Sequence, residues 1–197
     1  SDFRFNFSKT VVDSVLNRLE INQVLAGSPE ADAFFDKVWE QSDLRIDINE
    51  IHRNALVYGD CYAIVWPDMT GMMNIDYNSP LTTTIVYDQE NPRIKSFAAK
   101  MWQTVTTDGS KLLKLNLYYA DRIEKYLGSG DIDSVSMAGN FELMETVINP
   151  WNEIPVFHFR THKPYGRPEH DDAYGPQDAI NKLISTHMYS VDYQGAP

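Results

Sequence analysis

The sequence predicts an α+β fold, with N-terminal helices packed on a mainly antiparallel meander sheet and a C-terminal helix. Apolar residues recur at helical spacing before Gly59 and again after Pro176, whereas short β-favouring runs fill residues 60–160. These runs follow one another between turn signals, with no helical pattern between them. Since an alternating βαβ array would place a helix after each strand, this order indicates one main antiparallel sheet.

An extended arm precedes the first helix. Phe3, Phe5 and Phe7 alternate with polar residues, so they share one side of an extended segment. An arm of this length has no core of its own. We therefore expect it to dock on its own domain or on a neighbouring subunit.

Capping residues mark the first two helices. Ser8 is expected to cap a helix over residues 9–20, and a short strand is expected over residues 21–25. Ser28 and Pro29 are suited to the N-cap and the first position of the second helix, where the missing proline N–H costs nothing.

The third helix has signals at both ends. Asp47 and Glu50 have the spacing of a capping box, which predicts a start near Asp47. Gly59 is expected to end this helix, because glycine readily adopts the left-handed conformation found there.

The sheet is expected over residues 60–160. Its predicted strands are residues 60–66, 73–77, 83–87, 94–105, 111–119, 122–127, 141–148 and 154–159. Asp108-Gly109 is a strong hairpin signal between two of them. The small, polar run over residues 128–140 is expected to be a loop.

The last part, residues 161–197, is expected to be a loop and a helix. Gly175 can serve as N-cap and Pro176 as the first helical residue, while Gly195 and Pro197 would end the helix. One helical face is apolar and consists of Ile180, Leu183, Ile184, His187, Met188 and Val191. Together with the helical subregion, residues 1–59, and the sheet, this part is expected to complete a single domain over residues 1–197.

The composition is acidic, with a formal net charge of -11 and a pI of about 4.8. Proteins that grip nucleic acid across a broad surface are usually basic, because their affinity comes largely from neutralising phosphates. Two interpretations stay open: an ordinary acidic domain, or a surface that DNA passes without binding. Cys61 is the one cysteine, so no intrachain disulfide can form. No apolar stretch is long enough to span a bilayer, and no membrane partner is expected.

A metal-dependent hydrolase is an alternative that the histidines raise. Its candidate ligands are His158, His162, His170 and Asp172. The chain has no HExxH or CxxC pattern, and zinc ligands are usually held rigidly on separate elements. We therefore expect His158 to be a sheet residue and His187 to lie in a core or an interface. No nucleotide-binding or hydrolase motif is present, so no cofactor is predicted.

A calcium loop is a weaker alternative. Asp131, Asp133 and Glu142 fall at positions 1, 3 and 12 of the calcium-loop template. Ser136 stands where that template requires glycine, which excludes a standard calcium loop. Weak divalent binding by Asp131 and Asp133 stays open.

Four motifs follow one another near the C-terminal end: Asn149-Pro150, Ile154-Pro155-Val156, Gly166-Arg167-Pro168-Glu169 and a helix start from Pro176 to Leu183. Their order resembles that of tailed-bacteriophage and prophage portal proteins. In that family an N-P…I-P-V strand leads through a G-R-x-E loop into a helix. The loop often carries serine where this chain has Pro168.

The upstream part resembles the same family. A helix ends in Leu56-Val57-Tyr58-Gly59, a strand ends in Trp66-Pro67-Asp68, and a turn at Ser79-Pro80 precedes a strand ending in Val86-Tyr87-Asp88. The resemblance covers roughly residues 11–183 and corresponds to the N-terminal wing portion of a portal. It implies that the last helix leads towards a stem, with clip and crown segments further on.

The resemblance also implies a function. Portal proteins form a homo-oligomeric ring, usually a dodecamer, at one capsid vertex of the virion, and they assemble in the host bacterial cytoplasm. Double-stranded DNA is packaged and ejected through the ring without specific binding. The packaging terminase, the tail connector and capsid or scaffold proteins dock on it. The chain would be no enzyme, because the ATPase belongs to the terminase.

Interface residues can be proposed on the same basis. The candidate subunit or stem interface consists of Arg167, Glu169, Ile180, Leu183, Ile184, His187, Met188 and Val191. Lys163 and Arg167, with the acidic loop that follows them, are candidates for intersubunit ion pairs. Such pairs contribute little when they are exposed.

Overall fold

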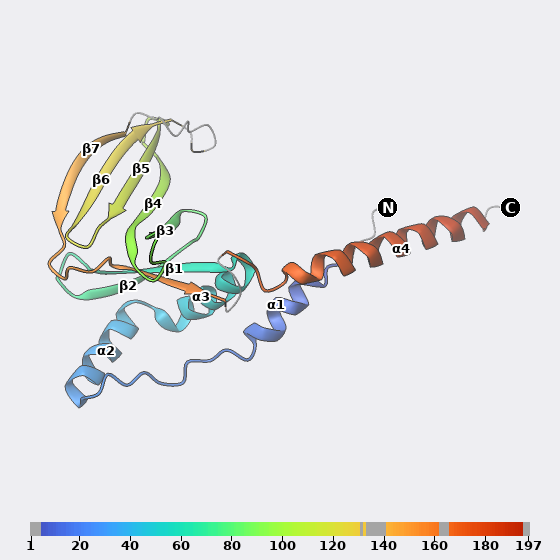
Figure 1. Cartoon of the computed structure of the whole chain (residues 1–197), viewed down its shortest axis with the longest axis horizontal. Coiled ribbons are helices and arrows are strands. Elements are labelled where there is room, and N and C mark those ends of the chain that lie inside the picture. The colour runs from blue at the N-terminus through green and yellow to red at the C-terminus, as the bar shows by residue number, and fades with distance from the viewer. Residues whose placement is uncertain (1–4, 131, 133–140, 162–165, 195–197) are drawn as a thin grey trace.

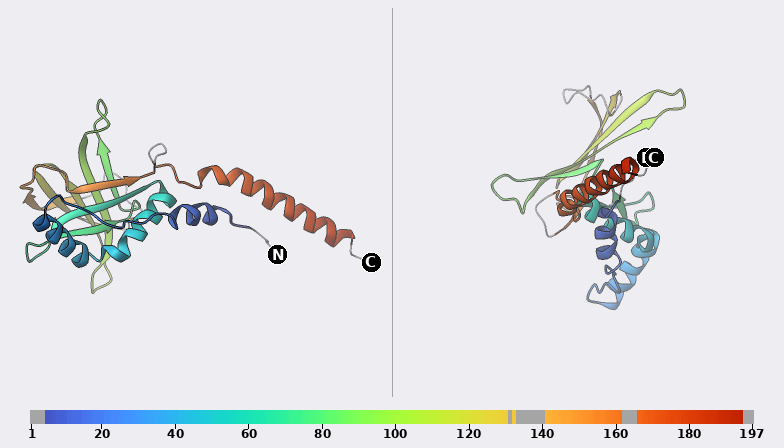
Figure 2. Two further views of the ribbon diagram at one scale, coloured as in Figure 1. Left: turned by 90° about the horizontal axis from the view of Figure 1, so that it is seen from below. Right: turned by 90° about the vertical axis from the view of Figure 1, so that its right-hand side faces the viewer.

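The computed structural model describes residues 5–130, 132, 141–161 and 166–194. A body of two sheets and three helices occupies one end of the molecule, and a long helix projects from it (Figure 1). The left view of Figure 2 shows the same projection, with the long helix lying clear of both sheets. The predicted α+β class is confirmed.

The N-terminal part contains three helices. They are α1 (Ser8–Leu16), α2 (Pro29–Gln41) and α3 (Leu44–Tyr58). The predicted start of α2 is confirmed, because the Ser28 hydroxyl accepts a hydrogen bond of 3.2 Å from the Ala31 amide and Pro29 opens the helix. Two acidic residues, Glu30 and Asp32, lie in its first turn, where they suit the helix dipole.

The predictions for α1 and the segment after it are wrong. Phe7 occupies the N-cap position of α1 without a side-chain bond, while the Ser8 hydroxyl donates to Gln177 instead. The helix stops at Leu16 rather than at residue 20, and no strand forms over residues 21–25. A strand needs a neighbouring strand to pair with, and these residues connect α1 to α2 with no strand of the described residues beside them (Figure 1).

The predicted start of α3 is also wrong. The helix begins at Leu44, so Asp47 lies inside its first turn instead of capping it. Asp43 precedes the helix in a left-handed conformation with φ 50°. The break between α2 and α3 is fixed by buried Ser42, whose hydroxyl donates to Asn74 and accepts from the Ile75 amide, at 2.8 and 2.9 Å. A tertiary contact therefore sets this boundary, and the capping-box spacing does not.

The strands divide between two antiparallel sheets, so the expectation of one main sheet is wrong. The first sheet has the order β2-β1-β8, with β1 (Asp60–Pro67), β2 (Met73–Asn78) and β8 (Val156–Arg160). The second is a five-stranded meander of β3 (Thr83–Tyr87), β4 (Lys95–Val105), β5 (Lys111–Tyr118), β6 (Arg122–Ser129) and β7 (Phe141–Ile148). Residues 79–82 separate the sheets, because the Thr82 and Thr83 amides both donate to the Ser79 carbonyl in a tight turn that leads into β3. β8 returns from the meander to pair with the free edge of β1.

The main core lies between the two sheets. It consists of Tyr62, Ile64, Ile85, Ala98, Tyr118, Ile123, Ile154 and Val156. A smaller cluster of Val12, Leu16 and Leu56 joins α1 to α3. α3 also contacts β1, so the helices cover the outer face of the three-stranded sheet (Figure 1). The body thus buries apolar faces of both sheets and of its helices.

The last helix, α4 (Tyr174–Gln194), follows the short 3-10 helix η2 (Asp171–Ala173). It begins before Gly175, so the prediction of Gly175 as N-cap is wrong. Pro176 is tolerated because it lies in the first turn, where its missing N–H has no helical partner. Gly195 and Pro197, the predicted stop, lie outside the described residues.

Candidate functional site

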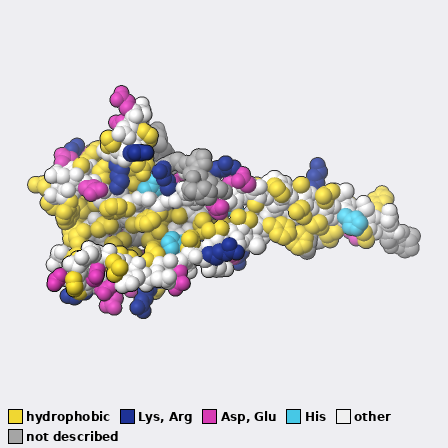
Figure 3. Space-filling view, turned by 60° about the horizontal axis from the view of Figure 1, so that its bottom comes forward, with side chains coloured by type: hydrophobic (Ala, Val, Ile, Leu, Met, Phe, Trp, Pro, Cys, Tyr) yellow, Lys and Arg dark blue, Asp and Glu magenta, His cyan; other side chains and the backbone are white. Residues whose placement is uncertain are grey.

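The candidate site is the projecting helix α4 together with the segments at its base. None of the described residues of α4 is buried. The predicted apolar face, called here the α4 stripe, consists of Ile180, Leu183, Ile184, His187, Met188 and Val191. Leu183 is 69% exposed and Val191 is 55% exposed. Hydrophobic side chains also gather along the projection in the space-filling view (Figure 3).

The arm is bound to the first half of α4. The Phe5 amide donates to the Asn181 side chain at 2.9 Å, and Asn181 donates back to the Phe5 carbonyl at 3.1 Å. The Gln177 side chain accepts from the Phe7 amide at 2.6 Å and from the Ser8 amide at 3.2 Å. The sequence left two docking surfaces open for the arm: its own domain or a neighbouring subunit. In the structure, the arm binds to α4 of its own chain.

The arm widens the apolar surface beside the α4 stripe. Phe5 and Phe7 stack on each other with ring centroids 5.6 Å apart, and they are 40% and 44% exposed. Gln177 and Asn181 are four residues apart and therefore share one side of the helix. Sequence reasoning missed these two residues. The sequence feature that could have identified them is the pair of amide side chains at helical spacing, because such side chains can form hydrogen bonds with an extended backbone.

The loop before α4 is anchored to the body. The Glu169 amide donates to the Leu56 carbonyl at 2.8 Å. A Cβ placed on Gly59 would lie 2.5 Å from the Arg167 nitrogen, so glycine is needed where the loop crosses the end of α3. Gly59 also has φ 83°, which confirms its predicted role in ending α3. This crossing sets the direction in which α4 leaves the body.

Arg167 forms its ion pairs within this loop. Its guanidinium donates to Asp171 at 2.8 Å and also to Asp172. The hydrogen bond that Arg167 donates to the Asp171 carboxylate is the main cause that raises the pKa of Arg167. Because these groups are exposed, each pair contributes little to stability. Lys163 lies outside the described residues.

The histidines proposed as metal ligands have other surroundings. His158, on β8, lies 2.6 Å from Asp60 and 2.8 Å from the Tyr87 hydroxyl, and its ring stacks on Tyr62. Burial lowers the pKa of His158, and the hydrogen bond to Asp60 opposes that shift. Both ring nitrogens thus lie within hydrogen-bonding distance of side chains from other strands, as expected for a sheet residue.

The other candidate ligands do not gather around His158. His170 lies against Tyr174, with 2.7 Å between its Nε2 atom and the tyrosine hydroxyl, and Asp172 contacts Arg167. Across the described ranges, the structure brings together no three histidine, cysteine or acidic side chains in a metal-binding arrangement. His162, Asp131 and Asp133 lie outside those ranges. The hydrolase alternative therefore gains no support from the described residues.

A comparison with protein-family models matches residues 3–195 to phage portal proteins of the SPP1 Gp6-like type. The chain belongs to the phage portal protein family. This match confirms the resemblance, and it spans the body, the loop and the described part of α4. The family provides a structural, oligomeric component of the phage virion. The search of curated proteins finds no match. No helix in the described part of the chain is long and apolar enough to cross a membrane.

Proposed function

We propose that this portal chain forms part of a ring at the capsid vertex through which double-stranded DNA is packaged and ejected. The complete ring has twelve subunits and assembles in the host bacterial cytoplasm. The chain itself performs no catalysis, because the packaging terminase supplies the ATP hydrolysis. The terminase, the tail connector and capsid or scaffold proteins dock on the assembled ring.

The exposed α4 stripe carries this proposal. Helices in proteins gain most of their stability by packing an apolar face, yet α4 has 21 residues and no buried side chain in its described length. Large exposed apolar patches mark interaction sites. A helix with this exposure fits a subunit whose apolar face is covered when the ring forms.

The interface that we propose combines this stripe with the charged residues at the base of α4. Arg167 and Glu169 lie in the loop that fixes the base of the helix to α3. A neighbouring subunit that covers the first turns of α4 meets these side chains. The exposed Phe5 and Phe7 rings extend the same surface along the arm.

The charge of the chain also supports the proposal. A formal net charge of -11 repels DNA phosphates, so the surface disfavours tight binding. A conduit requires DNA to move past its wall without being held. The acidic composition is therefore compatible with passage and unfavourable for a role in gripping DNA.

Sedimentation velocity of the full-length portal subunit tests the proposal. The unaltered protein is expected to sediment as a large ring. A double variant, Leu183→Asp with Met188→Asp, is expected to remain monomeric, because two carboxylates would be desolvated in the interface. Tyr189→Asp is the matched control, since Tyr189 is 78% exposed on the opposite side of α4. It is expected to leave the ring intact.

Two outcomes contradict the proposal separately. A strictly monomeric unaltered protein contradicts the ring. Rings that form equally well with the double variant contradict the assignment of the α4 stripe to the subunit interface.

A further inference from the structure

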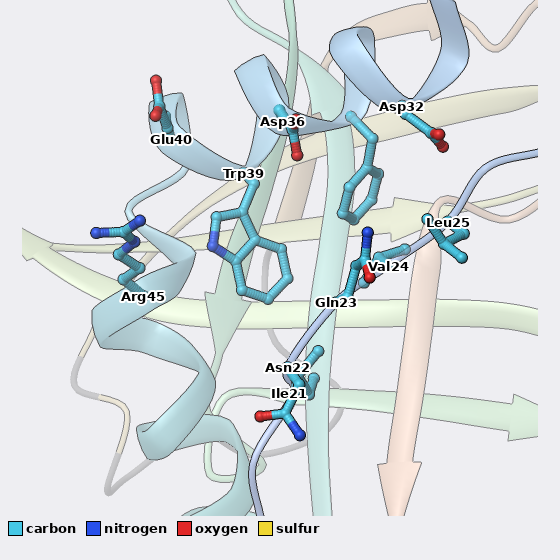
Figure 4. Close-up of a pocket in the computed structure, with 11 residues that line it drawn as sticks. Ile21, Asn22, Gln23, Val24, Leu25, Asp32, Asp36, Trp39, Glu40 and Arg45 are labelled. Carbon is cyan, nitrogen blue, oxygen red and sulfur yellow. The ribbon is translucent and has the colours of Figure 1, made fainter. Parts of the chain in front are cut away.

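A groove lies on the body, far along the chain from α4. We call it the α2 groove: residues 21–25 form one side, side chains of α2 form the other, and Arg45 of α3 lies at one end (Figure 4). Its volume is about 460 Å³. Among its lining residues, Leu25 is 69% exposed and Ile21 is 41% exposed.

The groove has an aromatic surface. Phe35 and Trp39 lie one helical turn apart on α2, with ring centroids 5.9 Å apart and an interplanar angle of 46°. The Trp39 ring points from α2 towards the segment that carries Asn22 and Gln23 (Figure 4). Both aromatic rings are only half-buried. Indole faces attract cations through the quadrupole of the ring.

The rim of the groove is acidic. Asp32, Asp36 and Glu40 line it at intervals of four residues, so their carboxylates share one side of α2. Like charges at this spacing repel one another, so Asp36 and Glu40 do not stabilise α2 through their mutual interaction. Asp32 accepts a hydrogen bond of 2.6 Å from the Ala26 amide and thereby holds the neighbouring segment in place.

Arg45 is the basic residue that lines the groove, and it does not neutralise the acidic rim. In the described part of the chain, Arg45 forms no ion pair with the three carboxylates. It extends from α3 at the Glu40 end, whereas Trp39 faces the opposite wall (Figure 4). The groove therefore combines a mainly polar lining, an aromatic pair, a few apolar side chains such as Val24 and Leu25, and excess negative charge.

We propose that the α2 groove docks a segment of a partner protein that carries an arginine or lysine beside apolar residues. The cationic group lies over Trp39 and between the carboxylates of Asp36 and Glu40, and the apolar neighbours contact Val24 and Leu25. Charge complementarity selects this occupant, because the rim repels phosphate and acidic segments. The groove lies within one chain, so the proposal does not depend on ring assembly.

A titration with short peptides tests this docking. The probe is the acetylated and amidated peptide Gly-Leu-Arg-Leu-Gly, and the comparison peptide has glutamine in place of arginine. The observable is the Trp39 indole N–H signal in the NMR spectrum of the whole chain, assigned by its loss in Trp39→Phe. The arginine peptide is expected to shift this signal saturably at about millimolar concentration. The glutamine peptide is expected to bind about fivefold more weakly.

Variants separate the acidic rim from the overall charge. The double variant Asp36→Asn with Glu40→Gln is expected to bind the arginine peptide about three- to tenfold more weakly than the unaltered chain. Glu142→Gln with Asp192→Asn removes the same charge from other elements and is expected to leave binding unchanged.

The contradicting results are equally specific. Equal binding of the two peptides, no shift at Trp39, or equal losses in both pairs of variants overturns the proposal. A Trp39 signal that moves with protein concentration alone identifies a second copy of the chain as the occupant and also overturns it.

Discussion

The body and the projecting helix reach stability in different ways. In the body, two sheets bury a shared core, and Cys61, Ala98 and Val156 have no exposed surface. In α4, the apolar stripe has no buried member, and the contacts at its base are mainly hydrogen bonds and ion pairs. The body therefore has a buried core of its own, whereas the stripe on α4 is exposed, as the proposed subunit interface requires.

Gly59 joins the two regions, and its substitution is expected to have the largest effect. In Gly59→Ala the new Cβ would lie 2.5 Å from backbone atoms of Gly166 and Arg167, in a conformation with φ 83°. The expected loss in unfolding free energy is about 3–5 kcal/mol, measured by urea denaturation.

Gly71→Ala provides the control for this substitution. Gly71 has a similar φ of 85°, but no atom lies within 4 Å of its added Cβ. The expected loss is about 1–2 kcal/mol, from the backbone conformation alone. Equal losses in the two variants would show that the close approach of the loop to α3 contributes nothing.

Two isoleucines, one in the body and one on α4, test directly whether the two regions differ in burial. Ile154 is 4% exposed between the sheets, and Ile180 is 40% exposed on α4. Ile154→Ala is expected to lower the unfolding free energy of the monomeric chain by about 2–4 kcal/mol, because it leaves a cavity. Ile180→Ala is expected to change it by less than about 0.5 kcal/mol. A large loss in Ile180→Ala would mean that α4 packs on the body in solution.

The pH dependence of stability is expected to originate in the body. Burial lowers the pKa of His158 and of His52 below the ordinary value of 6.5. The unfolded chain therefore takes up protons first as the pH falls, so stability that is fully present above pH 6.5 is lost below it. Denaturation between about pH 7 and pH 5 should show this loss, and His158→Gln should flatten the curve. An unchanged pH slope in His158→Gln would contradict the assignment to this residue.

The contact between the arm and α4 is expected to have the smallest effect on global stability. Gln177→Ala with Asn181→Ala removes the side chains that bond the arm backbone. Hydrogen exchange of the Phe5 and Phe7 amides is expected to accelerate about fivefold, because each lost bond contributes about 1 kcal/mol. Thr186→Ala, further along α4, is the control and should leave these amides unchanged. Unchanged exchange in the double variant would show that other contacts hold the arm.

Periodicity predicted the strands well, because each strand carries its own apolar pattern. The runs that were expected between residues 60 and 160 all form strands, with bounds that differ by a few residues. The division into two sheets could not be read in the same way. It depends on the direction that the chain takes after the local turn at Ser79, and on the pairing of β8 with β1, which are far apart in the sequence.

Helix boundaries show the same limit. Ser28 caps α2 as predicted, because its bond to Ala31 is local. Asp47 does not begin α3, because buried Ser42 ties the preceding turn to β2. Ser8 is drawn to Gln177, which is 169 residues away in the chain. Local propensity decides a boundary only where no tertiary partner competes for the capping group.

The sequence predicted which residues make up the apolar stripe of the candidate site. It did not predict which groups the side chains at the base of α4 contact. The stripe from Ile180 to Val191 follows from helical spacing, and its exposure agrees with a surface that another subunit could cover. The pairing of Arg167 with Asp171 and Asp172, and the amide contacts to the arm, required coordinates. Arg167 and Asp171 are four residues apart, as are Gln177 and Asn181, but this spacing alone does not specify which partner each side chain contacts.

Thiol labelling in the isolated chain and in the assembled ring tests the central claim most directly. The native Cys61 has no exposed surface, and burial raises its pKa to about 12, so an introduced thiol is the reactive one. Leu183→Cys is expected to react readily with a maleimide in the isolated chain and to be protected in the ring. Protection at that position, with continued reaction of Lys182→Cys on another side of the helix, is the result that the proposed interface predicts. Equal reactivity of Leu183→Cys in both states would contradict it.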